Sequence, residues 1–248
     1  MAVLIALRRT PGLFSPFYRA FRFSSLADDL QHNMHKQSTW DRFYVENCPS
    51  TFRHFDWFFG YKHVAGFLHT FLQNEKHMGH WHVLDVGCGT SDLGLGLYKG
   101  SPQPLHISCV DFSPVAIDSM QKHFATTAPI PLNPGSELHY READATNLAH
   151  LDSHTFHLVL DKGTMDALLR GKEGVARAGL MLAECFRVLH PGGSLLQFSD
   201  EDPDARLPFL EQIHGVEGSN ASVRAQDLGT VGSLQYYAYV MTAPTKYC

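Results

Sequence analysis

Short apolar runs alternate with helical segments along most of this chain, and no other feature constrains its fold as strongly. The runs that predict strands are WHVLDVG (81–87), LHISCVDFS (105–113), LHYREAD (138–144), FHLVLDK (156–162) and SLLQFSD (194–200). The stretches that predict helices cover residues 61–73, 92–99, 114–124 and 174–189. Because strands separated by helices are joined by right-handed crossovers, we expect an α/β fold around a doubly wound, mostly parallel sheet.

The last two strand-like runs lie closer together than the others. Residues 222–228 and 234–241 are separated only by residues 229–233, which are too few for a helical crossover. We therefore expect a hairpin that runs antiparallel at one edge of the sheet. The complete prediction is a seven-stranded sheet with helices on both faces.

The start of the chain differs in composition from the rest. Residues 1–24 contain four arginines among Leu and Phe side chains, and no acidic residue. This composition is typical of a mitochondrial transit peptide, with cleavage expected near Ser24, and a disordered basic tail is the alternative. The apolar run at its beginning is too short to cross a membrane.

Charge and cysteine content narrow the range of partners. Without the leader the chain has sixteen basic and twenty-five acidic residues, a formal charge of −9. So acidic a surface repels phosphate backbones, which disfavours nucleic acid as a partner. The five cysteines lack CxxC spacing, and the histidines lack carboxylate or cysteine partners at a ligand spacing. We therefore expect free thiols and no metal site.

Gly87 and Gly89 follow directly after the first predicted strand. A dinucleotide-binding loop has a third glycine three residues later, but here that position is Asp92, whose charge would repel a diphosphate. Two glycines still let the backbone turn sharply beside a ligand, and Asp85 supplies a negative charge suited to a cation. The motif predicts a loop for a cofactor without phosphate, with a purely structural turn as the alternative.

Two further acids follow neighbouring strands. Asp111 ends the second predicted strand, where a carboxylate can accept hydrogen bonds from both hydroxyls of a ribose. Capping of the next helix is its alternative role, although Ser113 and Pro114 already mark the start of that helix. Asp144 and Ala145 end the third strand, where we expect contact with an adenine amine. A simple turn is the alternative for Asp144.

The chain resembles the class I, seven-strand S-adenosylmethionine-dependent methyltransferases, which have a Rossmann-like fold. The resemblance covers roughly residues 80–200 and is carried by VLDVGCGTSDLG, CVDFSPVAI, READATNL, FHLVLDKGTMDAL and VLHPGGSLL. More narrowly, the chain resembles the methyltransferase-like protein-lysine methyltransferases, which include the elongation-factor-1A enzymes. The motifs that carry this narrower resemblance are TWDRFYVEN, FDWFFGYKHV and DKGTMDALL.

This resemblance implies a protein-lysine N-methyltransferase that uses S-adenosyl-L-methionine. Together with the leader it implies a protein substrate in the mitochondrial matrix, citrate synthase. It places at or near the cofactor Trp40, Tyr44, Gly87, Gly89, Asp111, Phe112, Asp144, Ala145 and Lys162. Phe55 departs from the pattern, because related enzymes can carry a tyrosine there. The chain would then consist of a transit peptide (1–24), a helical and aromatic lid segment (25–79) and an S-adenosylmethionine-binding methyltransferase domain (80–248).

Methyl transfer to a lysine requires a neutral amine in line with the methyl carbon, so positioning and the exclusion of water supply most of the catalysis. Asp161, near the end of the predicted strand 156–162, is the candidate catalytic residue. Because an ordinary Asp pKa is about 3.9, we expect it to orient the amine rather than act as a full base. Its alternative role is to cap the helix that begins near Thr164. For Lys162, an ion pair with Asp166 is the alternative to a place beside the cofactor.

Aromatic residues precede the first strand and form either a lid or ordinary core: Trp40, Phe43, Tyr44, Phe55, Trp57, Phe58 and Phe59. Trp40 and Tyr44 share one helical face and are the two favoured cofactor contacts. The main alternative function is a matrix methyltransferase for a small molecule such as a quinone precursor. A nicotinamide-dependent dehydrogenase is disfavoured by Asp92, and a non-catalytic relative would keep the glycines without binding a cofactor. No basic apolar helix follows the leader, so no stable membrane insertion is expected.

Overall fold

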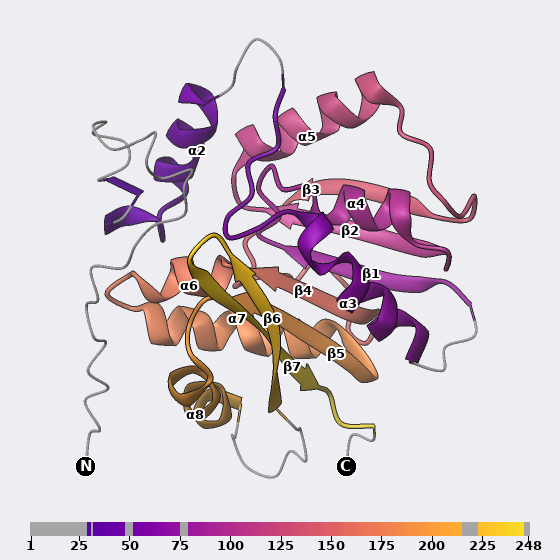
Figure 1. The fold of residues 1–248 in the computed structure, drawn as a ribbon. Coiled ribbons are helices and arrows are strands. Elements are labelled where there is room, and N and C mark those ends of the chain that lie inside the picture. Colours follow the sequence, from indigo (N-terminus) through magenta and orange to yellow (C-terminus); the bar gives the residue numbers. More distant parts are fainter. Residues whose placement is uncertain (1–28, 31, 48–51, 75–78, 215–222, 246–248) are drawn as a thin grey trace, which may run out of the picture.

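The computed structural model describes residues 29–30, 32–47, 52–74, 79–214 and 223–245, so the predicted leader lies outside the described residues. Its sheet has seven strands in the order β3-β2-β1-β4-β5-β7-β6 (Figure 1). They are β1 (Trp81–Val86), β2 (Leu105–Asp111), β3 (Glu137–Glu142), β4 (Phe156–Lys162), β5 (Leu189–Ser199), β6 (Val223–Val231) and β7 (Leu234–Thr242). Strands β1 to β5 pair in parallel, and β7 pairs antiparallel with both β5 and β6. The predicted sheet and its edge hairpin are confirmed.

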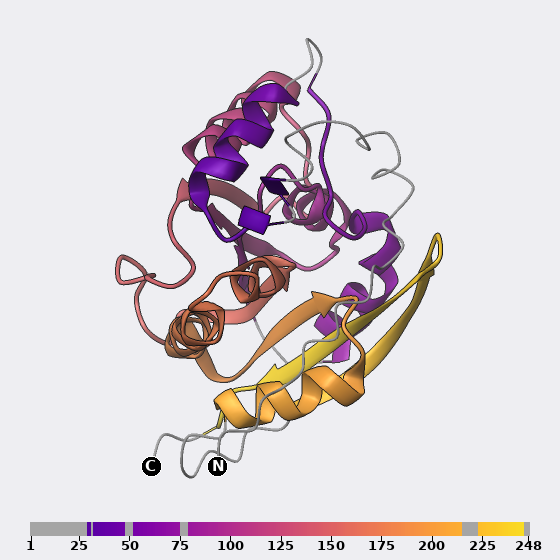
Figure 2. The same ribbon diagram turned by 90° about the vertical axis from the view of Figure 1, so that its left-hand side faces the viewer.

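Helices cover both faces of this sheet (Figure 2). They are α2 (Gln37–Glu46), α3 (Tyr61–Asn74), α4 (Leu93–Gly100), α5 (Pro114–Thr127), α6 (Thr164–Leu169), α7 (Gly174–Val188) and α8 (Pro203–His214). Helices α3, α4 and α5 share a hydrophobic core with one face, and α6, α7 and α8 share a second core with the other. Helix α2 packs beside α5 and carries a third, smaller cluster that includes Phe112 at the end of β2.

Strand β1 shows why a parallel sheet forms here. Trp81 and Val83 belong to the core under α3–α5, whereas Leu84 and Val86 belong to the core under α6–α8. Strands that are buried on both faces are nearly continuous apolar runs. Full burial of each such side chain contributes about 1.5–3 kcal/mol, so β1 fixes both helical layers against the sheet.

Three features differ from the sequence prediction. Strand β5 begins at Leu189, five positions before the predicted start, because the chain pairs with β4 through an irregular stretch that includes Gly192 at φ +80°. Helix α8 was not predicted, since it contains Pro208 and shows little amphipathic periodicity. The hairpin turn consists only of Gly232 and Ser233, because β6 continues past a bulge to Val231.

Candidate functional site

A pocket opens at the carboxyl ends of β1, β2 and β4, around the point where the strand order reverses. Ligands of open α/β sheets bind at this switch point. The pocket holds about 830 Å³ of empty space, part of it open to solvent. All nine residues expected near the cofactor line it: Trp40, Tyr44, Gly87, Gly89, Asp111, Phe112, Asp144, Ala145 and Lys162.

The loop after β1 forms one wall of the pocket with its backbone. Gly87 has φ +66° and Gly89 has φ +51°, both in the left-handed region that favours glycine. A Cβ atom on Gly87 would overlap the side chain of Thr164, and one on Gly89 would overlap the hydroxyl of Tyr44. Because the loop is packed this tightly, only glycine allows the backbone to approach a ligand here.

Asp111 is held at the end of β2 with its carboxylate beside this loop. Its side chain accepts the N–H of Gly89 on Oδ2 and the N–H of Ser113 on Oδ1, both at 2.8 Å. Burial raises its pKa to about 6, against the lowering effect of these two bonds. Ser113 caps α5 by accepting the N–H of Ala116, as predicted. Each carboxylate oxygen retains a further acceptor site, which suits the hydroxyls of a ribose.

A second buried carboxylate lines the pocket at the end of β1. Asp85 is 1% exposed, and burial raises its pKa to about 7. Asp161 and Asp111 raise this pKa further, while the Lys162 ammonium opposes the shift. A bound cation would favour the ionised form of Asp85 and is therefore favoured by it. Asp85 was noted as a charge in the sequence but not assigned to the site, although its place directly before the glycines is the signal.

Asp92, which stands where a dinucleotide loop has its third glycine, is not among the pocket-lining residues. Its Oδ1 accepts the N–H of Tyr61 at 2.5 Å, at the first residue of α3. A carboxylate at that position stabilises the helix N-terminus. The missing glycine is thus explained by a contact between two helices.

The pocket ends on the β3 side with an ion pair. Asp144 accepts the N–H and the O–H of Thr146 on Oδ1, both at 2.8 Å, and its Oδ2 lies 3.4 Å from Nη2 of Arg177. These are contacts of the turn alternative, although the residue also lines the pocket. Arg177 and His35 line this end too and were missed in the sequence. Neither belongs to a motif, and α7 brings Arg177 there from far along the chain.

Aromatic side chains form another wall of the pocket. The ring of Trp40 stacks on Tyr44 and meets Trp57 edge-on, with 5.8 Å between ring centroids in both pairs. Trp40 also donates its indole N–H to the carbonyl of Met34 at 2.6 Å. With Leu30, Met34 and Phe43 it forms the buried part of a small core, so Trp40 belongs to this core and to the pocket wall at once. Phe55 lines the pocket as well.

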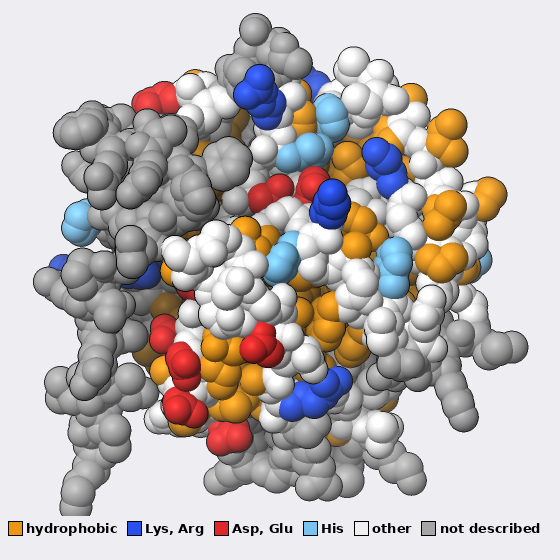
Figure 3. Space-filling view, in the orientation of Figure 1, with side chains coloured by type: hydrophobic (Ala, Val, Ile, Leu, Met, Phe, Trp, Pro, Cys, Tyr) orange, Lys and Arg blue, Asp and Glu red, His pale blue; other side chains and the backbone are white. Residues whose placement is uncertain are grey.

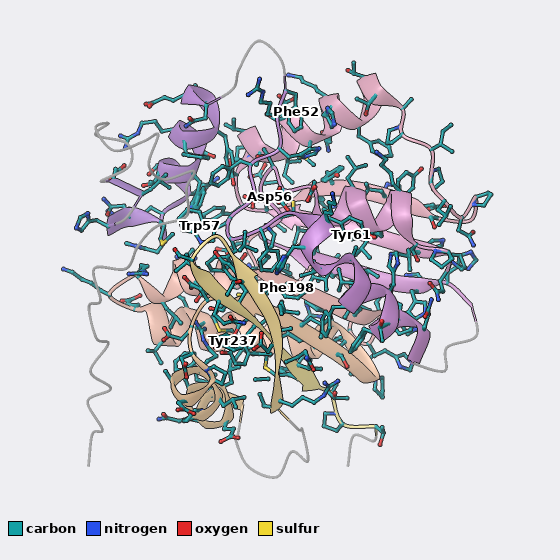
Figure 4. All side chains as sticks on the ribbon, viewed as in Figure 1. Phe52, Asp56, Trp57, Tyr61, Phe198 and Tyr237 are labelled. Atoms are coloured by element: carbon teal, nitrogen blue, oxygen red, sulfur yellow. The ribbon has the colours of Figure 1, made fainter. Side chains whose placement is uncertain are left out.

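Lys162 reaches the extended segment 52–60 that precedes α3, which we call the strap. Its Nζ donates to Oδ1 of Asp56 at 3.1 Å and to the carbonyl of Trp57 at 2.9 Å. Figure 4 labels both of these strap residues. The alternative ion pair with Asp166 is wrong, because that carboxylate pairs with Arg206 on α8.

Asp161 lies beneath the pocket and does not line it. Its Oδ1 accepts the N–H groups of Thr164 at 2.8 Å and Met165 at 3.4 Å, and its Oδ2 accepts the side-chain amide of Gln197 at 3.0 Å. Burial raises its pKa to about 6. These contacts are those of the capping alternative, since they hold the first turn of α6.

These residues fit S-adenosylmethionine. The glycine loop offers close backbone approach, Asp111 offers acceptors for a ribose, and Asp85 offers negative charge for a cationic group. Among the described residues no three His, Cys, Asp or Glu side chains are grouped as metal ligands, and no described helix is long and apolar enough to cross a membrane.

Comparison with known proteins agrees with this fit. Residues 83–193 match the family model described as a methyltransferase domain. A solved SAM-dependent methyltransferase from Methanosarcina mazei superposes with a TM-score of 0.55 at 14% identity, covering 71% of this chain and 98% of that one. This likeness concerns the fold.

Two curated relatives are similar over almost their whole length. The mitochondrial citrate synthase-lysine N-methyltransferase of Danio rerio is 45% identical, covering 92% of this chain and 91% of the relative. The human protein of the same name is also 45% identical, covering 97% and 98%. With the methyltransferase fold and a pocket that fits S-adenosylmethionine as its cofactor, the chain belongs to the family of protein-lysine methyltransferases that these two proteins represent.

Proposed function

We propose that this protein methylates a lysine of citrate synthase in the mitochondrial matrix. The observation that carries the proposal is the extent of the similarity: 45% identity over 97% of the chain reaches well outside the methyltransferase-domain match at residues 83–193. The strap, α8 and the β6–β7 hairpin all lie outside that match. A relative that shared only a cofactor-binding domain would not be expected to resemble these parts.

The residues around the pocket divide the work of holding the reactants. S-adenosylmethionine supplies an electrophilic methyl group when bound. The loop of Gly87 and Gly89 and the carboxylate of Asp111 would fix its nucleoside, and Asp85 would favour its positive charge. Because the reaction is a displacement between two held groups, fixing their relative position supplies much of the rate enhancement.

The aromatic wall serves the target amine. A lysine ammonium has a pKa of about 10.4 in water and must lose its proton before it can attack carbon. Trp40, Tyr44 and Trp57 surround it with apolar surface, and desolvation beside another positive charge lowers that pKa. Asp161 contributes by holding α6 and the turn at Gly163, and we assign it a positioning role.

The surface next to β5 suits a lysine-bearing partner. Four exposed acidic residues follow β5: Asp200, Glu201, Asp202 and Asp204. Figure 3 shows acidic side chains grouped in the region of α8 and the hairpin. An acidic surface steers association with basic segments of a protein through complementary charge. The same surface repels phosphate backbones.

The test is to incubate the full chain with labelled S-adenosylmethionine and purified citrate synthase, beside a mitochondrial matrix extract. We expect label on one citrate synthase lysine, located by mass spectrometry, and its loss in the Asp111→Ala variant. Label only on other proteins would contradict citrate synthase as the substrate. Label only on small molecules would favour the small-molecule alternative, and an absence of label everywhere would contradict an enzymatic function.

A further inference from the structure

The ammonium of Lys162 is enclosed by the strap. Its side chain is only 5% exposed, with Asp56 and the carbonyl of Trp57 as hydrogen-bond acceptors and the ring of Phe59 5.9 Å away. All three partners are consecutive or nearly so in the strap. A buried ammonium group is stable only when its N–H groups donate hydrogen bonds. Lys162 therefore attaches the strap to the end of β4.

Asp56 extends this connection to the glycine loop. Its Oδ1 also accepts the hydroxyl of Ser91 at 2.6 Å and the N–H of Asp92 at 3.3 Å. The strap is further held by the N–H of Phe55, which donates to the carbonyl of Thr90 at 3.3 Å. The strap therefore has two attachments, one on the loop after β1 and one on Lys162.

The backbone of the strap is strained where these attachments end. Phe58 has φ +72°, which is costly for a bulky residue and persists only where the surroundings enforce it. Next to it, Trp57 packs closely against the turn after β4, because a Cβ on Gly163 would lie 2.8 Å from Cδ1 of the indole. The unfavourable backbone conformation of Phe58 therefore lies directly beside a residue that lines the pocket.

The sheet order shows which part of the pocket Trp57 occupies. Asp111 ends β2 and Asp144 follows β3, on one side of β1, whereas Lys162 ends β4 and Gly163 follows it, on the other side. The nucleoside contacts belong to the β2–β3 side. Trp57 therefore lies at the opposite end, which the nucleoside leaves for the methyl group and the incoming amine.

We propose that Lys162 is a positioning residue that holds Trp57 as the wall against which the target lysine side chain lies. This inference rests on the proposed function and deepens it, because it names the specificity-determining residue for a long alkyl amine. It differs from the sequence expectation, in which Lys162 touches the cofactor. The indole would exclude water from the amine and align its chain with the methyl carbon.

The experiment measures kcat and KM with citrate synthase, and cofactor affinity by calorimetry, for Lys162→Met, Trp57→Leu and the double variant. Lys122→Met is the matched control, because it removes an exposed i,i+4 ion pair on α5. We expect each single variant to lower kcat/KM for citrate synthase at least 30-fold, with cofactor affinity within threefold of wild type. In the double variant we expect no further loss beyond Trp57→Leu alone.

Two results would overturn the inference. If Lys162→Met lowered cofactor affinity tenfold or more, and this loss accounted for the change in kcat and KM with citrate synthase, Lys162 would be a cofactor-binding residue. If the losses of kcat/KM in the two single variants multiplied in the double variant, Lys162 would act independently of Trp57. If Lys162→Met does not fold, Asp56→Asn tests the same attachment with the same expected split, since it weakens the ion pair and keeps an acceptor oxygen.

Failure of the proposed function gives a separate signature. Wild-type protein that leaves citrate synthase unmethylated contradicts the substrate, whatever the variants do. The positioning role is then decided by amide hydrogen exchange over residues 55–59. Faster exchange in Lys162→Met than in wild type, with unchanged cofactor affinity, supports the role of Lys162, and unchanged exchange contradicts it.

Discussion

The same strands carry opposite chemistry at their two ends. At the carboxyl ends of β1, β2 and β4, the buried carboxylates of Asp85, Asp111 and Asp161 have pKa values raised by burial to about 6 or 7. At the amino ends, imidazole rings follow one another across β1, β2, β4 and β5, with centroids 4.5–5.6 Å apart. In order along this row they are His80, His106, His82, His157 and His190.

The difference lies in how each group of side chains is stabilised. The imidazoles of the row contact one another and the backbone. For example, the backbone N–H of His82 donates to Nδ1 of the His157 ring at 3.0 Å. The carboxylates at the other end keep raised pKa values even with hydrogen bonds to the protein, because burial still penalises their charge. Buried groups with perturbed pKa values gather at functional sites, and here they separate a ligand-binding edge from a structural edge.

Loss of Asp111 is expected to have the largest effect on cofactor binding at the carboxyl ends of the strands. Asp111→Ala removes the acceptors for a ribose and leaves the N–H groups of Gly89 and Ser113 without their carboxylate. Two hydrogen bonds to a charged group together contribute about 3–6 kcal/mol, so cofactor affinity should fall at least about 100-fold. Calorimetric titration with S-adenosylmethionine measures this, and an affinity within threefold of wild type would contradict the assignment.

Gly87→Ala tests whether the carboxyl edge depends on close packing as well as charge. The new Cβ would overlap Thr164, and φ +66° is unfavourable for alanine. Left-handed strain and overpacking together should lower the free energy of unfolding by about 2–4 kcal/mol. Gly66→Ala is the control, because nothing lies within 4 Å of its Cβ in α3 and it should stabilise by about 0.5–1 kcal/mol. Denaturant unfolding compares the two, and equal behaviour would contradict the packing argument.

The raised pKa values predict how cofactor binding depends on pH. Asp85 and Asp111 become ionised as the pH rises through about 6 to 7, and a cation binds the ionised form more tightly. The affinity for S-adenosylmethionine should therefore increase about tenfold from pH 5.5 to 7.5. S-adenosylhomocysteine lacks the sulfonium charge and serves as the control ligand. Equal pH dependence for both ligands would show that the carboxylates do not respond to the sulfonium.

The stability of the ligand-free protein should change in the opposite direction. Because the folded-state pKa values of these carboxyl groups lie above the unfolded value of about 3.9, the folded protein binds more protons than the unfolded chain between about pH 4 and pH 7. Their contribution to the free energy of unfolding therefore decreases as the pH rises through this window. Asp85→Asn should reduce this slope, and thermal unfolding at several pH values measures it. An unchanged slope would contradict the raised pKa of Asp85.

The features that could be predicted from the sequence are those that depend on residues close together in the chain. The apolar runs gave the strands of the parallel sheet, because two-sided burial leaves a continuous pattern, and Ser113 before Pro114 marked the start of α5. The glycines and Asp111 follow directly from strand ends, so they were found with their motif. The structure brings all nine predicted cofactor residues to one pocket, and their binding roles stay predictions.

Local sequence patterns do not predict contacts between segments that lie far apart in the chain. Lys162 pairs with a strap residue more than a hundred positions away, whereas sequence reasoning considered only the nearby Asp166. Asp92 could be recognised as a departure from the dinucleotide loop, but its contact with Tyr61 at the start of α3 depends on how two helices pack. Helix α8 lacks the periodicity on which its recognition depends. Tertiary packing decides each of these cases.

The smallest expected effect belongs to the histidine row. His157→Ala removes the acceptor for the N–H of His82, and one such hydrogen bond contributes about 1 kcal/mol to the free energy of unfolding. Cofactor affinity should stay within twofold of wild type, because the row lies at the opposite ends of the strands from the pocket. His139→Ala, an exposed ring on β3, should change neither quantity measurably. If His157→Ala weakened cofactor binding tenfold, the two edges would be coupled through β1 and β4, and the division between a structural and a binding edge would be wrong.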